Sequence, residues 1–246
     1  MRAKLSRGKA MRKEVFVPGN FIHIYNRGNK KAAIFKDEND YWRFLKTLFY
    51  FNDSYAPKNI LREIDFIIKT GKCGKFEWPA AWPQRKPLVR LLAYCLMPNH
   101  FHLLLQEIDF GGTSNFMHRL GTAQTNYFNI KYKEDGRLFQ GTYKSKIVED
   151  IGYLQYLGCY IQVLNPFELF KGGIEASLNN FDQAFEAAVD YPFSSLGESI
   201  GVRKIGIIDS SDFKKMFEKT ENYKKFSMDA LIRRNNRSYI GELAID

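Results

Sequence analysis

The chain has 246 residues, of which 45% are hydrophobic and 15% aromatic, which suffices for one large domain or one domain with an appendage. Its 37 Lys and Arg residues outnumber 27 Asp and Glu residues, and the net charge of +10 fits a polyanionic partner as well as simple solubility. No apolar run approaches the roughly 18 residues needed to cross a bilayer, and the charged N-terminus lacks the apolar core of a signal peptide, so we expect neither secretion nor membrane insertion.

The three cysteines, Cys73, Cys95 and Cys159, are odd in number and show no Cys-x-x-Cys spacing. They lie mostly among apolar neighbours. This usage is typical of reduced, buried thiols, and it predicts a cytoplasmic protein.

The N-terminal part of the chain divides into four segments. Residues 1–13 carry six Lys or Arg and no acid, which predicts a basic flexible arm, either a plain lead-in or a contact to a phosphate backbone. The alternation of apolar and polar residues over 20–25 predicts a strand. Residues 37–52 open with acids and repeat aromatics at helical spacing, which predicts an amphipathic helix. Residues 53–88, rich in Pro and Gly, predict an irregular insertion.

Two apolar strands are predicted next, at residues 89–96 and 101–106, separated by a turn at Met-Pro-Asn. His100 and His102 follow that turn. On a strand they point to the same face about 6.5–7 Å apart, within reach of one divalent metal ion, while Phe101 points into a core. The two histidines either bind a metal ion together or occur at this spacing by chance on a half-buried strand. His23 and His118 have no partner at ligand spacing and read as structural or surface residues.

The remaining elements complete an α+β pattern. A helix capped by Thr113 and Ser114 is predicted to run to about Lys131, followed by a strand over 137–149. A third helix is predicted over 150–164 and must stop near Pro166. The order is strand, helix, strand, strand, helix, strand, helix. It predicts a ferredoxin-like antiparallel sheet with helices on one face.

The last predicted helix carries Tyr153, Tyr156 and Tyr160 on one face. Most tyrosines are structural. A phenol beside a metal-bound phosphate is nevertheless a competent nucleophile, because a nearby cation stabilises the phenolate and attack leaves a covalent phosphotyrosine.

Residues 201–246 are predicted to form a helical, basic C-terminal extension, since apolar residues recur there at helical spacing among many Lys and Arg. A small DNA-recognition appendage would show this pattern. One or two helices packed on the main domain would show it equally well.

Five ordered blocks resemble the single-tyrosine HUH transposases, named for their His-hydrophobic-His motif, and specifically the REP-associated tyrosine transposases. The blocks are IYNRGNKKAAIFKDENDYWRFL, AYCLMPNHFHLLL, GRLFQGTYKSKIVED, YLQYLGCYIQVLNPFE and YPFSSLGESIG. They imply a transposase-like domain over about residues 14–200, interrupted by the insertion at 53–88.

The resemblance implies a metal-dependent transposase and single-strand DNA endonuclease. In this chain His100 and His102 would hold Mg²⁺ or Mn²⁺, and Tyr160, which opens the family's Tyr-Ile-x-x-Asn-Pro segment, would be the nucleophile. Members nick and rejoin single-stranded or hairpin DNA through a 5′-phosphotyrosine, commonly as homodimers. No nucleotide cofactor is implied, which agrees with the absence of a P-loop motif.

The chain departs from the family pattern at one position. The polar residue that can complete the metal site follows the tyrosine by four, but here position 164 is Leu and Asn165 is displaced by one. If the helix widens before Pro166, Asn165 can still reach the metal. Otherwise the third ligand is water, Gln155 or Gln162.

The basic residues expected to contact DNA are Arg27, Arg119, Arg137, Lys144 and Lys146. Three rival readings stay open. The protein could be a catalytically silent hairpin-DNA-binding descendant of a transposase, which the displaced Asn165 favours, or a nickase of the relaxase or replication-initiator type. A ferredoxin-like RNA-binding module fits less well, because the aromatic signature of an RNA recognition motif is missing.

Overall fold

The computed structural model describes residues 15–71, 76–217 and 219–235, so the predicted basic arm at 1–13 lies outside it. Its centre is an antiparallel sheet of four strands in the order β2-β3-β1-β4. The strands are β1 (Phe21–Arg27), β2 (Val89–Met97), β3 (His100–Glu107) and β4 (Lys144–Val148). With α1 (Glu38–Tyr50) after β1 and α3 (Gly112–Tyr132) after β3, this is the predicted ferredoxin-like α+β arrangement.

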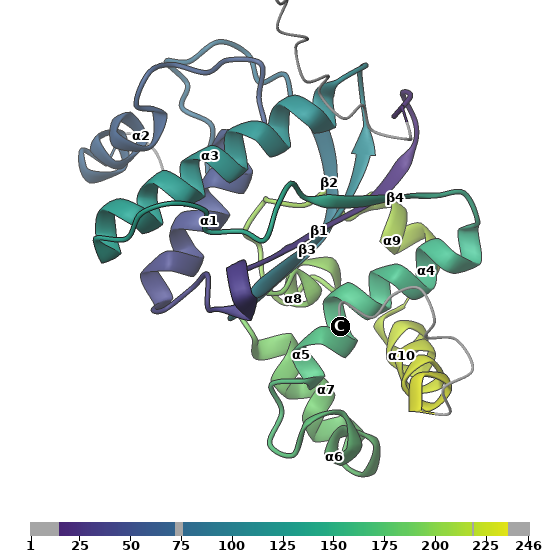
Figure 1. Cartoon of the computed structure of the whole chain (residues 1–246). Helices are drawn as coiled ribbons and strands as arrows, with labels where there is room; N and C mark the ends of the chain where they lie inside the picture. Colours follow the sequence, from purple (N-terminus) through teal and green to yellow (C-terminus); the bar gives the residue numbers. More distant parts are fainter. Residues whose placement is uncertain (1–14, 72–75, 218, 236–246) are drawn as a thin grey trace, which may run out of the picture.

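Alternation along the strands sends apolar side chains to the face that α1 and α3 cover (Figure 1). β1 contributes Ile22 and Ile24 there, and β3 contributes Phe101, Leu103 and Leu105, all 2% exposed or less. Phe101 packs against Phe44 of α1 with ring centroids 5.2 Å apart. The predicted inward position of Phe101 is therefore confirmed.

Helices also cover the second face of the sheet, which corrects the prediction of a single helical layer (Figure 1). β2 is apolar on both sides, and its Ala93, Cys95 and Met97 belong to a second core together with Leu104 of β3. A strand that is apolar on both faces must be buried on both. The covering layer begins with α4 (Ile151–Cys159), continues through the π-helix η2 (Tyr160–Leu164) and ends with α5 (Asn165–Phe167).

The C-terminal part adds further helices to this second layer. They are α6 (Gly173–Asn179), α7 (Phe181–Asp190), α8 (Leu196–Ser199), α9 (Ser211–Phe217) and α10 (Thr220–Asn235). In the C-terminal extension, α10 packs against α4, α6 and η2, so it contributes to the covering of the main domain. None of the helices within the described ranges is long and apolar enough to cross a membrane. Cys95 and Cys159 are buried and free, as predicted, and Cys73 lies outside the described residues.

Two predictions about helices differ from the structure. The segment 53–88 contains a helix, α2 (Ile60–Lys69), which buries Ile60, Leu61 and Ile64. Helix α3 begins after Gly111, which has a φ of 82°, and neither Thr113 nor Ser114 caps it. Glycine adopts this left-handed conformation at little steric cost because it has no Cβ. A Cβ at Gly112 would lie 2.2 Å from the Leu88 carbonyl oxygen.

Between α3 and β4 the chain is mostly irregular, so the strand predicted over 137–149 is limited to Lys144–Val148. Before it, Phe139 forms an isolated bridge with Gly28. Gly28 leads into a short 3₁₀ turn, η1 (Asn29–Lys31). A Cβ at Gly28 would lie 2.0 Å from the Ala32 carbonyl oxygen, which explains why the NRGN turn needs glycine there.

Asp40 joins α1 to α3 through a buried carboxylate. It forms a capping box with Asp37 and accepts hydrogen bonds from Lys131, Tyr127 and Tyr132 of α3 at 2.6, 2.9 and 2.7 Å. Burial alone would raise the pKa of Asp40, but these hydrogen bonds and one from the Lys36 backbone N–H together lower it. The ionised carboxylate therefore stabilises the fold.

We expect Asp40→Asn to lower the free energy of unfolding by about 1–3 kcal/mol at pH 7, because the network loses its charged acceptor. Since the folded-state pKa is depressed, the contribution is present above the unfolded pKa of about 3.9 and is lost as the pH falls below it. Urea titrations at pH 7 and pH 3 measure this: wild type and variant should converge at low pH. Asp65→Asn, at a pair with Lys46 that is 45% exposed on the aspartate, is the control and should cost about 1 kcal/mol or less. Equal losses at both pH values would contradict the role of the charge.

Candidate metal and nucleophile site

The helix that follows β4 changes from α to π geometry at Tyr160, and this change determines the geometry of the site. Asp150 caps α4, accepting from the Tyr153 N–H at 2.7 Å. At η2 the backbone N–H of Asn165 bonds to the Tyr160 carbonyl, five residues back. One extra residue per turn brings Asn165 onto the face where the residue four after the tyrosine would lie in an α-helix. The widening considered in the sequence analysis is present.

Pro166 gives the physical reason for the widening. Its ring excludes the carbonyl of the residue four before it, Gln162, and it has no N–H to donate. The freed Gln162 carbonyl accepts from the Ser194 hydroxyl at 3.0 Å instead. Helical structure continues to Phe167, one residue past Pro166, so the prediction that the helix stops near Pro166 is confirmed. The chain accommodates the proline by a π turn.

His100 and His102 share the sheet face that η2 covers, as their spacing predicted. The His102 ring is fully buried, and its centroid lies 5.3 Å from that of His100 and 5.3 Å from that of Tyr160. Tyr160 is 6% exposed. Sheet and helix thus bring together three residues that are up to 60 positions apart in the chain.

Each of the two histidines has its Nδ1 atom in a hydrogen bond within the protein. His100 Nδ1 lies 2.7 Å from Asn99 Oδ1, and Asn99 Nδ2 donates to the Lys31 carbonyl. Because an amide oxygen only accepts, His100 Nδ1 carries the proton and its Nε2 keeps a lone pair. His102 Nδ1 lies 2.8 Å from His23 Nε2, and His102 Nε2 is buried without a hydrogen-bond partner.

His23 therefore has a partner at the site, contrary to its reading as a merely structural or surface residue. It is 2% exposed, and β1 pairs with β3 so that His23 lies opposite Leu104, two register positions from His102 and on the same face of the sheet. Burial, with a smaller contribution from Lys146, lowers the pKa of His23 to about 3, so the ring is neutral at pH 7. The sequence did show His23 as a polar ring between the apolar residues of FIHIY. Its contact with His102, however, depends on how β1 pairs with β3. His118, by contrast, is exposed.

The side chain of Asn165 is oriented toward these rings. Its Nδ2 donates to the Tyr160 carbonyl at 2.9 Å, and its Oδ1 is buried with no hydrogen-bond partner. Burial lowers the pKa of His100, and the nearby Asn165 side chain acts in the opposite direction. Three atoms are thus available as acceptors at the site: His102 Nε2 and Asn165 Oδ1, which are buried without a donor, and His100 Nε2, which keeps a lone pair. This donor set suits a divalent cation.

Of the alternative third ligands, Gln162 is engaged elsewhere. Its amide donates to Ser195 and Ser199 and accepts from Tyr223. Across the described residues, no group of three or more His, Cys, Asp or Glu side chains is arranged to hold a metal. Asn165, whose side chain acts on the pKa of His100, is therefore the favoured candidate to complete a site with the two histidines.

Tyr160 also contacts the C-terminal extension. The guanidinium carbon of Arg234, on α10, lies 5.6 Å from the centroid of its ring. Arg234 donates to Glu168 at 2.8 Å, which fixes its position. Burial raises the pKa of Tyr160, and Arg234 acts against that rise. Sequence reasoning gave Arg234 no role, because its approach depends on how α10 packs.

Three of the five basic residues predicted to bind DNA lie near this face. Arg27 lies opposite His100 in the pairing of β1 with β3, and Lys144 and Lys146 lie opposite Tyr25 and His23. Lys144 is exposed. Arg137 is also exposed and lies in the loop before β4, and this loop is joined to the turn after β1 by a hydrogen bond from the Asn29 N–H to the Leu138 carbonyl.

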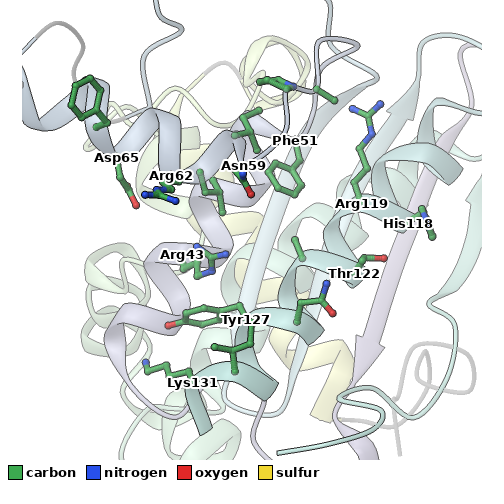
Figure 2. Close-up of a pocket in the computed structure, with 18 of the residues that line it drawn as sticks. Arg43, Phe51, Asn59, Arg62, Asp65, His118, Arg119, Thr122, Tyr127 and Lys131 are labelled. Atoms are coloured by element: carbon green, nitrogen blue, oxygen red, sulfur yellow. The ribbon is translucent and has the colours of Figure 1, made fainter. Parts of the chain in front are cut away.

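Arg119 lies elsewhere. It projects from α3 on the opposite face of the sheet, into a groove of about 1000 Å³ between α1, α2 and α3 (Figure 2). Its Nη1 donates to the Asp53 carbonyl at 2.6 Å. The structure therefore does not bring Arg119 together with the histidines.

Residues 84–163 match the model of a protein family described as "Transposase IS200 like". The predicted resemblance to transposases is thereby confirmed for this segment. This transposase-like segment contains both histidines of the motif and Tyr160, and it ends two residues before Asn165.

A solved structure described as "Structure of the REP associates tyrosine transposase bound to a REP hairpin" is also similar to this chain. The identity is 13% and the TM-score 0.43, over 83% of this chain and 96% of the other. No curated protein matches the chain.

Proposed function

We propose that this protein is a metal-dependent transposase that nicks and rejoins single-stranded DNA at hairpins through a 5′-phosphotyrosine on Tyr160. The observation that supports the proposal most strongly is the π turn at Tyr160–Leu164, because Asn165 then follows Tyr160 by one wide turn and its side chain acts on the His100 ring, while Tyr160 packs against His102. The match of the transposase-like segment to its family supports the same conclusion.

In this proposal His100, His102 and Asn165 would hold Mg²⁺ or Mn²⁺, which would supply Lewis-acid stabilisation of the scissile phosphate. Tyr160 attacks phosphorus, so that a phenolic O–P bond forms and the P–O3′ bond breaks. The phenol gives up its proton, and the departing 3′ oxygen gains one. Rejoining is the reverse attack by a 3′-hydroxyl.

The DNA strand would approach from the side where β4 and the NRGN turn present Arg27, Lys144 and Lys146. Contacts from these cations to phosphates would position the strand without reading its sequence. Selectivity would then come from the hairpin shape of the DNA. The homodimer implied by the resemblance is part of the proposal, and light scattering on the purified protein tests it.

The silent DNA-binding alternative loses its main argument. It rested on the displacement of Asn165 by one residue, and the π turn compensates for that displacement. The relaxase or replication-initiator reading shares the same chemistry and differs in substrate.

The test uses wild-type protein, Mn²⁺ and a single-stranded hairpin oligonucleotide labelled at either the 5′ or the 3′ end, resolved on a denaturing gel. We expect a protein-linked band from the 3′-labelled strand only, because a 5′-phosphotyrosine retains the downstream fragment. The band should vanish with EDTA. Salt-sensitive binding with no adduct on any hairpin would instead support the silent DNA-binding protein.

Arg234 gives a further prediction about Tyr160. A guanidinium over the ring stabilises the phenolate, so Arg234→Gln should slow adduct formation by about 10–100-fold and shift its pH dependence to higher pH. Rates are measured from pH 6 to pH 10 with hairpin in excess. Arg233→Gln, which changes the exposed neighbouring arginine on the same helix, is the control. Identical pH profiles for Arg234→Gln and wild type would disprove the effect on the phenol.

A further inference from the structure

A buried pair of histidine rings connects β1 to the candidate metal site. His23 Nε2 and His102 Nδ1 lie 2.8 Å apart, with ring centroids separated by 5.1 Å. Both rings are at most 2% exposed. A contact this short between two nitrogens requires one proton between them, so one ring donates and the other accepts.

The direction of that donation decides whether His102 can bind a metal. If His23 donates, the neutral His102 carries its own proton on Nε2, and the nitrogen that faces the site has no lone pair to offer. If His102 donates from Nδ1, its Nε2 keeps a lone pair. A ring nitrogen ligates a metal only through a lone pair, so only the second tautomer is competent.

The surroundings of Nε2 favour the competent tautomer. A proton on His102 Nε2 would be a buried donor without a hydrogen-bond partner, since none of the described residues provides one. Asn99 imposes the equivalent tautomer on His100, because Asn99 Oδ1 can only accept. Both histidines of the motif, whose ring centroids lie 5.3 Å apart on one face of the sheet, then keep a lone pair on Nε2, as binding to a shared cation requires.

We infer that His23 is a positioning residue for the metal site: its Nε2 accepts the Nδ1 proton of His102 and so fixes His102 in the tautomer whose Nε2 can bind a divalent cation. This inference rests on the proposed metal-dependent function, but the tautomer itself is a property of the metal-free protein. His23 does not touch the substrate or the metal.

Nitrogen-15 NMR tests the inference directly. In metal-free protein with labelled histidine, protonated and unprotonated ring nitrogens of neutral imidazole have well-separated shifts, and the chain has only four histidines to assign. We expect His102 to carry its proton on Nδ1. Finding the proton on Nε2 in the wild type would overturn the inference.

Variants extend the test to metal affinity, measured by calorimetry with Mn²⁺. His23→Leu should lower the affinity about 10–100-fold, the usual effect of losing a residue that orients a ligand. His23→Gln keeps an acceptor oxygen and should recover most of it. His118→Gln, at the exposed fourth histidine, should match wild type. Melting curves confirm that each variant is folded.

The outcomes separate this inference from the proposed function. Wild-type affinity in a folded His23→Leu would overturn the positioning role while leaving the nuclease intact. Wild-type protein with the expected tautomer that binds no Mn²⁺ would overturn the metal-dependent function, while supporting the assignment of the His102 proton.

Discussion

Tyr160→Phe is expected to reduce formation of the covalent protein–DNA adduct by at least about 10³-fold, because the phenolic oxygen that bonds to phosphorus is missing. Binding of the hairpin and of Mn²⁺ should be nearly unchanged, since the ring still fills its place beside His102. The adduct is measured on a denaturing gel, and DNA affinity by fluorescence anisotropy at fixed salt. The change removes one oxygen atom, so misfolding is an improbable explanation for any loss.

Tyr156→Phe is the matched control, because Tyr156 lies one turn earlier on α4 and is partly buried. It should form the adduct at the wild-type rate. If Tyr156→Phe abolished the adduct and Tyr160→Phe did not, the nucleophile would be misassigned. An adduct that persists in both variants would rule out Tyr160 as the attacking residue.

Asn165→Ala is expected to weaken Mn²⁺ binding by about 100-fold or more and to slow adduct formation accordingly. Loss of a residue that only orients a metal ligand costs about 10–100-fold, so loss of a ligand should cost at least as much. Asn165→Asp places a carboxylate oxygen at the same position and should retain or increase the affinity. Calorimetry with Mn²⁺ and the gel assay measure the two effects separately.

Asn180→Ala controls for the loss of a local hydrogen bond. The amide of Asn180 donates to the Ala176 carbonyl at 3.0 Å at the end of α6, as the amide of Asn165 donates to Tyr160 at 2.9 Å. Asn180→Ala should leave both metal affinity and adduct formation unchanged. Wild-type Mn²⁺ affinity in a folded Asn165→Ala would show that the two histidines and water suffice.

Much of the fold was predictable because local patterns and burial agreed. The alternation at FIHIY and the apolar runs around His100 predicted β1, β2 and β3 to within a few residues. The second helical layer was not expected. Its signal was present in VRLLAYCLM, where Ala93, Cys95 and Met97 leave β2 apolar on both faces.

For the site, strand periodicity alone placed His100 and His102 on one face, and helical periodicity offered Tyr160 among several tyrosines. The resemblance selected Tyr160. Neither pattern could show that His23 bonds to His102, because that contact joins residues 79 positions apart through the register of β1 on β3.

The sequence by itself determined the α+β class, the shared face of the two motif histidines and the basic character of the chain, because these follow from local periodicity and composition. Only the tertiary structure decided which face of α4 and η2 meets the sheet, how Pro166 and Ser194 sustain the π turn that turns Asn165 inward, and that Arg234 lies over Tyr160. These outcomes depend on packing between distant segments, and no local pattern encodes which segments will meet.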